Sequence, residues 1–226
     1  NHAESIFEIQ YEKGYTGGSQ WSCQAHSRDL ATTLGVSTGA VTLPTADIIE
    51  KFDTGSARYE ATIGKLSGGG KMISHVKKHY MELSIQNHSD DNWPLLRYAD
   101  VLLMYAEALN ELNPTPTDEA IDCINQIRRR AFAVTDTSHD LTPAEIIDQQ
   151  TFREVIALER RLELCFEGHR WFDLVRTGEY MKVMNAHFER YNAGAYVVEN
   201  YNDLFPIPQR EIDVNPNLLP NNPGYN

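Results

Sequence analysis

Apolar residues recur at a helical spacing from Tyr98 onward, and this feature constrains the fold more than any other. Tyr98, Leu102, Tyr105 and Leu109 follow one another at spacings of four, three and four. Residues at this period lie on one face of an α-helix, so the pattern predicts an amphipathic helix. The helix is expected to end at the Asn-Pro-Thr-Pro sequence of residues 113–116, because proline lacks the backbone donor and clashes with the preceding turn.

A second helix is predicted directly after these prolines. Thr117 or Asp118 caps its N-terminus, and Ala120, Ile124 and Ile127 share one of its faces. Because the connecting turn is short, the two helices are expected to pack antiparallel.

A third, longer helix is predicted from a capping box. Thr142 is followed by Pro143 and then by Glu145, a sequence typical of a helix N-terminus. Gly168 is expected to end this helix, and a further helix is predicted over residues 170–178. The expected apolar stripe of the third helix consists of Val155, Leu158, Leu162 and Cys165.

These patterns predict a mainly α protein, a scaffold of tetratricopeptide-like helical pairs with long loops and a few short strands. The N-terminal part is less regular. Phe7, Ile9 and Tyr11 alternate with polar residues and predict a strand over 4–11. Residues 13–42 are rich in Gly, Ser and Thr and predict a long loop.

Short elements are expected between this loop and the helical part. Residues 45–53 predict a short helix capped by Thr45. The segment from Arg58 to Ile63 alternates like a strand, the glycines at 68–70 predict a hairpin or loop, and a strand is predicted near 81–85.

The composition excludes several classes of function. The net charge is −12 and the pI is near 5.1, whereas a nucleic-acid-binding protein needs a basic patch. No run approaches the roughly 20 apolar residues that a membrane span needs. The three cysteines form no Cys-x-x-Cys pair, so neither a metal site nor a cofactor is predicted. Cys123 and Cys165 lie among apolar residues, where cysteine is expected to pack as a small hydrophobic side chain.

Charges of both signs are dense around the end of the third predicted helix. A spacing of four places Glu159, Glu163 and Glu167 on one helix face, where unpaired carboxylates would repel one another. Nearby arginines can pair with them, which favours a structural ion network. The alternative is a metal pair or an acid–base pair of His169 with Asp173. The residues assigned to the network are Glu159, Glu163, Glu167, Arg170 and Asp173.

Aromatic residues provide the candidate ligand contacts. The sequence contains no motif of a serine hydrolase, a zinc protease or a dinucleotide-binding enzyme, so no catalytic residue is assigned and a binding protein is expected. Trp93, Trp171 and Phe172 adjoin helical stripes and are expected in the core. Tyr15 and Trp21 lie in the Gly/Ser-rich loop. They either contact a ligand, since a flat ring covers the C–H face of a sugar or a peptide side chain, or form a local core of the loop.

Several segments taken together resemble the SusD/RagB family. The resemblance extends over nearly the whole chain. The most specific matches are WPLLRYADVLLMYAEALNE at 93–111, ERRLELCFEGHRWFDLVRTG at 159–178, LFPIPQREID at 204–213 and NPGY at 222–225.

The resemblance implies a lipid-anchored protein on the extracellular face of the outer membrane of a Bacteroidetes-type bacterium. Such a protein is a cell-surface glycan-binding subunit of a nutrient importer. It captures an oligosaccharide, or a peptide, for a SusC-like TonB-dependent transporter, and it catalyses nothing. The alternative function is that of an intracellular tetratricopeptide-type scaffold that binds protein partners.

The resemblance also implies a domain organisation. In the family, the lipid-attachment cysteine and the first helical repeats lie upstream of the strand at 4–11. Residues 1–226 are therefore expected to be the C-terminal part of a single SusD-like domain, with the missing N-terminal half as a partner. Residues 1–92 would be a strand- and loop-rich, ligand-facing region, 93–190 the helical pairs, and 191–226 an extended tail.

Overall fold

The computed structural model describes residues 3–12, 14, 18–21, 25, 42–68, 71–78, 89–191, 194 and 196–225. These residues belong to two compact units, Asn1–Glu167 and Gly168–Asn226. The division falls inside the region 93–190 that the sequence assigns to helical pairs. Each unit is described by itself below.

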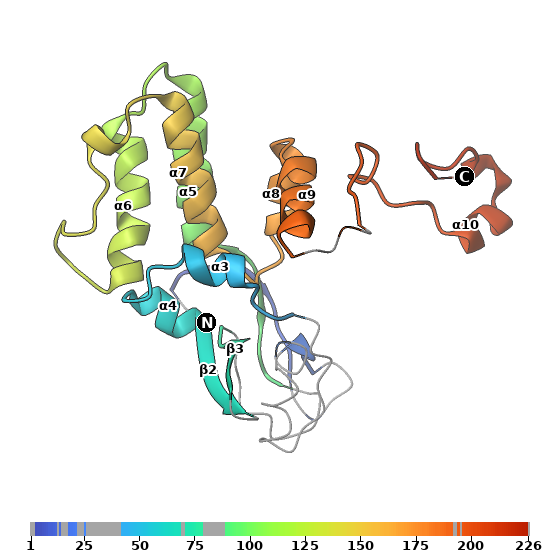
Figure 1. The fold of residues 1–226 in the computed structure, drawn as a ribbon, viewed down its shortest axis with the longest axis horizontal. Coiled ribbons are helices and arrows are strands. Elements are labelled where there is room, and N and C mark those ends of the chain that lie inside the picture. Colours follow the sequence, from blue (N-terminus) through green and yellow to red (C-terminus); the bar gives the residue numbers. More distant parts are fainter. Residues whose placement is uncertain are drawn as a thin grey trace. The chain divides into compact units, whose positions relative to one another are not determined.

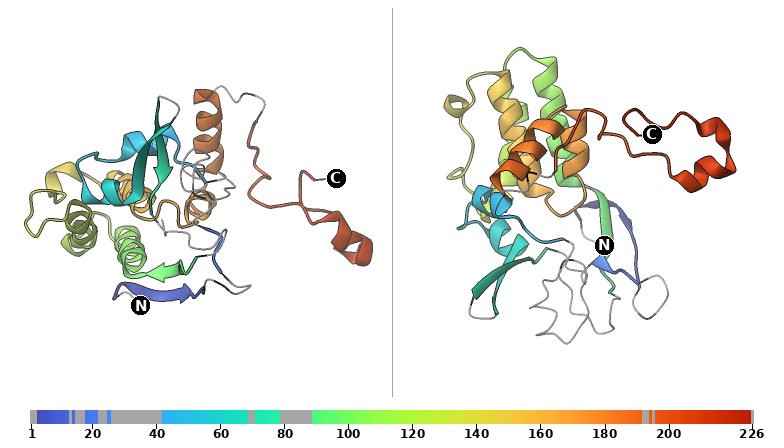
Figure 2. Two further views of the ribbon diagram at one scale, coloured as in Figure 1. Left: turned by 90° about the horizontal axis from the view of Figure 1, so that it is seen from below. Right: turned by 45° about the vertical axis from the view of Figure 1, so that its right-hand side comes forward.

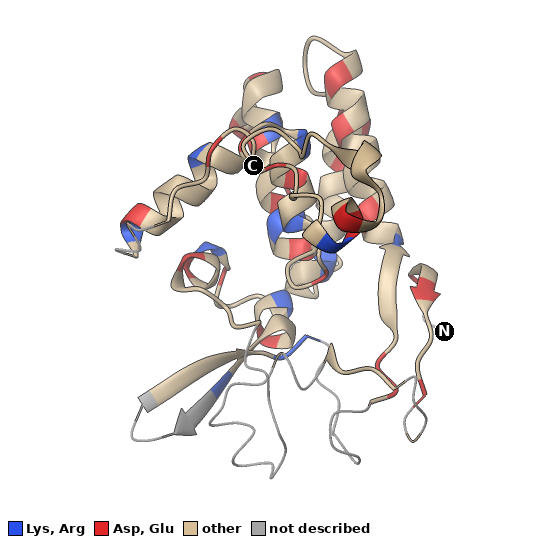
Figure 3. Cartoon of the chain, turned by 90° about the vertical axis from the view of Figure 1, so that its right-hand side faces the viewer, with Lys and Arg blue, Asp and Glu red and all other residues tan. Residues whose placement is uncertain are grey.

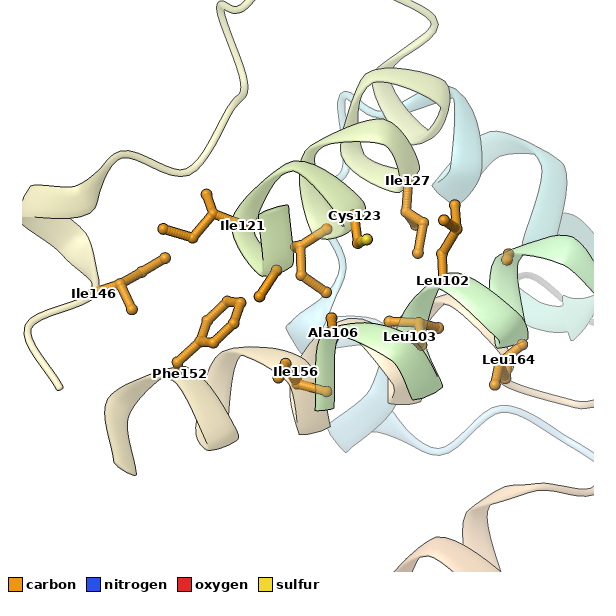
Figure 4. Close-up of a cluster of buried hydrophobic side chains, with 13 residues drawn as sticks. Leu102, Leu103, Ala106, Ile121, Cys123, Ile127, Ile146, Phe152, Ile156 and Leu164 are labelled. Atoms are coloured by element: carbon orange, nitrogen blue, oxygen red, sulfur yellow. The ribbon is translucent and has the colours of Figure 1, made fainter. Parts of the chain in front are cut away.

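Three helices of equal length form the centre of the first unit (Figure 1). They are α5 (Tyr98–Leu112), α6 (Asp118–Phe132) and α7 (Gln149–Glu163), and α5 contacts both of the others. Phe152, Leu103 and Ile156 are almost fully buried in their shared core. Figure 4 shows this core, where Phe152 and Ile156 of α7 point toward α5 and α6. The mainly α fold predicted from the sequence is confirmed.

The buried face of α5 differs from the predicted stripe. Tyr98 and Tyr105 are 51% and 44% exposed, whereas Leu103 and Ala106 are fully buried. Since α5 packs against two helices, its buried sector is broad and centred on Leu103. The prediction that Tyr98 and Tyr105 lie on the buried face was therefore wrong. Apolar residues occur on several sides of this helix, so the helical period alone fits more than one choice of buried face.

Helix starts follow the local capping rules, except that one helix begins later in the sequence than predicted. The predicted cap of α6 is confirmed, as the Thr117 side chain accepts from the backbone of Ala120. The capping box of Thr142 and Glu145 forms, but it encloses only a 3-10 turn. Helix α7 begins later, where Asp148 caps it. The predicted start of the third helix was wrong because a capping box satisfies one turn whether or not a helix continues.

Two small antiparallel sheets complete the first unit. Strand β1 (Ser5–Ile9), predicted from its alternation, pairs with β4 (Trp93–Arg97), and Figure 2 shows these two strands side by side. Strands β2 (Ile63–Gly68) and β3 (Lys71–Val76) pair antiparallel, with Gly68 opposite Lys71. The strand predicted near residues 81–85 lies outside the described residues.

Two short helices pack near the end of α7. Helix α3 (Ala46–Lys51) has the predicted cap, Thr45. Helix α4 (Ala57–Thr62) occupies the segment for which a strand was predicted, so that prediction was wrong. The Ser56 side chain accepts from the backbone of Tyr59 and starts a helix that a six-residue alternation cannot reveal. A second core joins these helices to α7, and its buried members are Ile48, Phe52, Tyr59, Ile63, Leu162 and Cys165.

The second unit contains α8 (Arg170–Arg176), α9 (Tyr180–Arg190) and α10 (Gln209–Val214). Helix α8 matches the predicted element, but Phe172 on it is 71% exposed, so its assignment to the core was wrong. Adjacent side chains on a helix point about 100° apart, and Trp171 is the one that packs, edge-to-face on Tyr180 at 5.9 Å.

Side chains that bond to the backbone hold the C-terminal segment of this unit. Asn221 accepts from the backbone of Ile207 at 2.8 Å, and Asn222 donates to the carbonyl of Phe205 at 2.6 Å. The hydroxyl of Tyr225 donates to the carbonyl of Leu204 at 3.0 Å. The tail therefore has a defined conformation of its own. Among the helices that the structure describes, none is both long and apolar enough to cross a membrane.

Candidate functional site

Three buried carboxylates follow one another along the end of α7. Glu159, Glu163 and Glu167 are only 2%, 3% and 4% exposed. Glu159 and Glu163 stand one turn apart on α7, and Glu167 follows in the turn after it. A buried carboxylate is stable only where hydrogen bonds and opposite charges replace water.

Arg97, at the end of β4, is the main partner of two of these carboxylates. Its Nε and Nη2 donate to the two oxygens of Glu167 at 2.8 and 2.9 Å, a bidentate pair. Its Nη1 donates to Glu163 Oε1 at 2.8 Å. Nη2 also donates to the backbone carbonyl of Glu163 at 2.7 Å. One guanidinium thus connects β4 to the end of α7.

The remaining cations come from α4, from Lys78 just after β3, and from α6. Arg58 Nη1 donates to Glu159 at 2.5 Å and to Glu163 at 3.2 Å. Lys78 pairs with Glu167 and donates to the backbone carbonyl of Glu163 at 2.7 Å. From α6, Arg128 lies 3.7 Å from Glu159, and Arg130 pairs with both Glu163 and Glu4. Figure 3 shows basic and acidic residues close together along the helices.

The sequence identified the carboxylates of this cluster but not their partners. It assigned Arg170 and Asp173 to the same network. Both lie on α8, in the second unit, where Asp173 accepts from Arg176 at 2.9 Å. The cationic partners lie tens of residues away in the sequence, where no spacing rule applies; they are Arg58, Lys78, Arg97, Arg128 and Arg130. The only available signal was that buried carboxylates must be paired.

The electrostatics of the cluster favour the ionised forms of Glu163 and Glu167. Burial by itself raises the pKa of Glu163, but Arg97, Arg130, Lys78 and Arg58 together lower it to about 2. Burial also raises the pKa of Glu167, but the charges and hydrogen bonds of Lys78 and Arg97 have the larger effect and lower it. A general acid needs a raised pKa, so neither carboxylate is suited to donate a proton near neutral pH. The described residues contain no group of three or more side chains that could hold a metal ion.

A pocket of about 370 Å³ opens beside the cluster. Arg58, Lys78, Arg130, Glu4 and Glu163 contribute its charged lining. Each of these cations already has a carboxylate partner, so the pocket presents balanced charge rather than a dedicated anion site. Small side chains line the remainder, those of Ala57, Ala61, Thr62 and Ala131.

Of the two predicted ligand contacts, the structure describes Trp21, and Tyr15 lies outside the described residues. Trp21 is half-buried and packs edge-to-face on Trp93 with 4.6 Å between ring centroids. Its Nε1 is buried, and no acceptor for it lies within hydrogen-bonding distance among the described part of the chain. Close by in sequence, Ser19 pairs with Ser89 through two backbone hydrogen bonds. The structure thus brings Trp21 against the start of β4.

The comparison with protein families decides the identity of the chain. The model of the SusD family matches residues 55–225, which span both compact units. The chain belongs to the SusD family. The resemblance to SusD/RagB proteins expected from the helical segments and the tail is therefore confirmed.

Individual relatives of this SusD-family chain agree with that result. SusD-like protein P2 of Formosa agariphila is 36% identical over 157 residues, which are 67% of this chain and 30% of that protein. A SusD homolog from Bacteroides thetaiotaomicron is 27% identical with a TM-score of 0.74, covering 98% of this chain and 52% of that one. Surface glycan-binding protein A from Bacteroides fluxus is 25% identical with a TM-score of 0.77, covering 98% and 51%. The chain thus spans about half the length of these solved structures and less of the curated relative.

Proposed function

We propose that the chain is part of a cell-surface protein that binds glycans. The observation that carries this proposal is its likeness to a surface glycan-binding protein A, that of Bacteroides fluxus, at a TM-score of 0.77 over 98% of the chain. Membership of the SusD family supports the same function. The lowered pKa values of Glu163 and Glu167 favour binding without catalysis, because neither carboxylate is suited to donate a proton.

The wider arrangement belongs to the same proposal. The chain forms the C-terminal part of a single SusD-like domain. The complete protein is anchored by a lipid on the extracellular face of the outer membrane and passes an oligosaccharide or peptide to a SusC-like TonB-dependent transporter. Support for this arrangement comes from the family and from the share of its relatives that the chain covers. Co-purification of the transporter from detergent-extracted outer membranes tests it, and recovery of the protein alone would contradict it.

Trp21 and Tyr15 are the proposed ligand contacts. The Trp21 ring remains partly exposed while its edge contact with Trp93 fixes its orientation. A fixed, partly exposed indole can cover the apolar C–H face of a sugar ring at little entropic cost. Tyr15 lies in the same sequence segment and carries the smaller ring.

The experiment measures binding of the protein to a panel of soluble polysaccharides by affinity electrophoresis. We expect at least one polysaccharide to retard the parent protein. Trp21→Ala should then weaken its affinity by roughly thirtyfold, and Tyr15→Ala should weaken it less. Phe172→Ala, which removes an exposed ring elsewhere, is the matched control and should bind like the parent.

Two outcomes would count against these assignments. If no polysaccharide retards the parent, the proposed function is wrong. If Trp21→Ala binds like the parent but melts at a much lower temperature, Trp21 belongs to a local core with Trp93 and the ligand lies elsewhere.

A further inference from the structure

Four aromatic rings form an unbroken series at the C-terminal end of α9. The Tyr191 ring lies 4.7 Å from that of His187, centroid to centroid. The His187 ring lies 5.9 Å from that of Phe188, which in turn lies 5.8 Å from Tyr196. The series therefore joins the last turn of α9 (shown in Figure 1) to a residue of the segment that follows it.

Asn185 fixes this following segment against the helix. Its Oδ1 accepts from the backbone of Val198 at 2.8 Å, and its Nδ2 donates to the carbonyl of Val198 at 2.9 Å. Two bonds between one side chain and one residue hold the backbone in register with α9. Tyr196, two residues earlier, is thereby kept beside Phe188 without a ligand, so the surface is preorganised.

The tyrosines at the two ends of the series are exposed. Tyr191 is 41% and Tyr196 66% exposed, whereas Tyr180, at the start of the same helix, is 8% exposed and donates its hydroxyl to the carbonyl of Asn200. The guanidinium of Arg190 lies over the Tyr191 ring, 5.6 Å from its centre. The surface therefore combines two exposed rings that carry hydroxyl groups with a guanidinium stacked on one of them.

This combination fits a carbohydrate. The C–H face of a pyranose packs on a tyrosine ring, while its hydroxyl groups accept from donors at the ring edge. Tyrosine and arginine are also enriched at interfaces between proteins, so the choice of a carbohydrate here follows from the proposed glycan-binding function. Here charged Glu189 and Arg190 directly precede Tyr191 and are exposed.

We propose that Tyr191 and Tyr196, with Arg190, form a carbohydrate-binding surface on α9 that is additional to the contacts at Tyr15 and Trp21. This inference rests on the proposed function. A protein with two contacts for one polymer holds a long chain more tightly than a short one, because the second contact forms at high effective concentration. The α9 surface thus favours polysaccharides over their short fragments.

The test uses the soluble polysaccharide that retards the parent in the panel, together with the hexasaccharide derived from it. Tyr196→Ala should weaken binding of the polysaccharide by about tenfold, and the double change Tyr191→Ala with Tyr196→Ala by more. Binding of the hexasaccharide should change less, because it depends on one contact. Tyr196→Phe keeps the ring and should bind nearly as the parent does, and Phe172→Ala is again the matched exposed-ring control.

A labelling experiment on the parent covers the case in which a variant fails to fold. Tetranitromethane nitrates exposed tyrosines, and the polysaccharide should protect Tyr191 and Tyr196, as read by mass spectrometry of the peptides. Full nitration in its presence, or a double variant that folds and binds like the parent, would overturn this inference. If Trp21→Ala still abolishes binding in that case, the proposed function stands and only the α9 surface fails. If the parent binds no polysaccharide, both are wrong.

Discussion

Glu163 has the largest set of charge contacts among the residues described above. Its carboxylate pairs with Arg58, Arg97 and Arg130, and its backbone carbonyl accepts from Arg97 and Lys78. Only 3% of its surface is exposed. Because several cations meet at this one carboxylate, we expect the position to be sensitive to loss of the charge.

The first prediction concerns Glu163→Gln. The amide keeps the shape of the side chain but removes the buried charge that Arg58, Arg97 and Arg130 share, although each arginine retains a second carboxylate, Glu159, Glu167 or Glu4 respectively. Breaking a buried ion pair from one side costs roughly 3–5 kcal/mol of unfolding free energy. Urea denaturation should show this loss. The control is Glu111→Gln, whose exposed pair with Arg153 should leave the midpoint unchanged. Equal midpoints for parent and Glu163→Gln would contradict the prediction.

The second prediction concerns pH. The pKa of Glu163 in the folded protein is about 2, below its ordinary value of 4.5, because the surrounding cations favour the ionised form. Its contribution to stability is therefore complete above pH 4.5 and is lost as the pH falls from 4.5 toward 2. The difference in unfolding free energy between the parent and Glu163→Gln should shrink over that window. A difference that stays constant down to pH 3 would show that Glu163 is not the titrating group.

At the scale of elements, the start of α6 depends on a single side chain. Thr117 Oγ1 accepts from the backbone N–H of Ala120 at 3.2 Å, one of the donors that a helix N-terminus leaves unpaired. Thr117→Ala should lower the unfolding free energy by about 1 kcal/mol, measured by urea denaturation followed by far-UV circular dichroism. Thr115→Ala, the same change at an exposed residue of the preceding turn, is the control. If both variants unfold alike, the cap contributes nothing.

Elements with local signals could be predicted from the sequence. Thr45 and Thr117 mark helix starts by rules that involve three or four neighbouring residues, and both caps form. The strand predicted from Arg58 to Ile63 is instead helix α4, because a pattern of only six residues fits a strand and a short helix equally well. The face of α5 could not be chosen, since that choice depends on which helices pack against it. The exposure of Phe172 could not be foreseen for the same reason.

The candidate sites show the same limit. Carboxylate spacing along one helix placed Glu159, Glu163 and Glu167 together, because that geometry is local. The partners Arg58 and Arg97 were missed, since their pairing is set by the tertiary fold. Composition drew attention to the loop of Trp21, but its contact with Trp93 joins two segments that only the fold brings together. The role of Tyr15 and Trp21 in ligand binding stays a prediction.

At the scale of the whole molecule, we expect no hydrolysis of glycans. Cleavage of a glycosidic bond needs a carboxylic acid with a raised pKa to protonate the leaving oxygen. Glu163 and Glu167 instead have lowered pKa values, so they are ionised near pH 7. Incubation with the polysaccharide panel should release no new reducing ends. Turnover that disappears in a folded Glu167→Gln variant would show that the cluster is catalytic.

The long sequence separations of the Glu163 pairs have a consequence for the order of folding. Arg97 and Glu163 are 66 residues apart, and Arg58 and Glu163 are 105 apart. Such contacts close large loops, and the chain loses that conformational entropy before the contact compensates for it. We therefore expect them to form after the rate-limiting barrier. In stopped-flow kinetics Glu163→Gln should speed unfolding and leave the refolding rate almost unchanged. The network would then slow the unfolding of the native protein without helping it to fold.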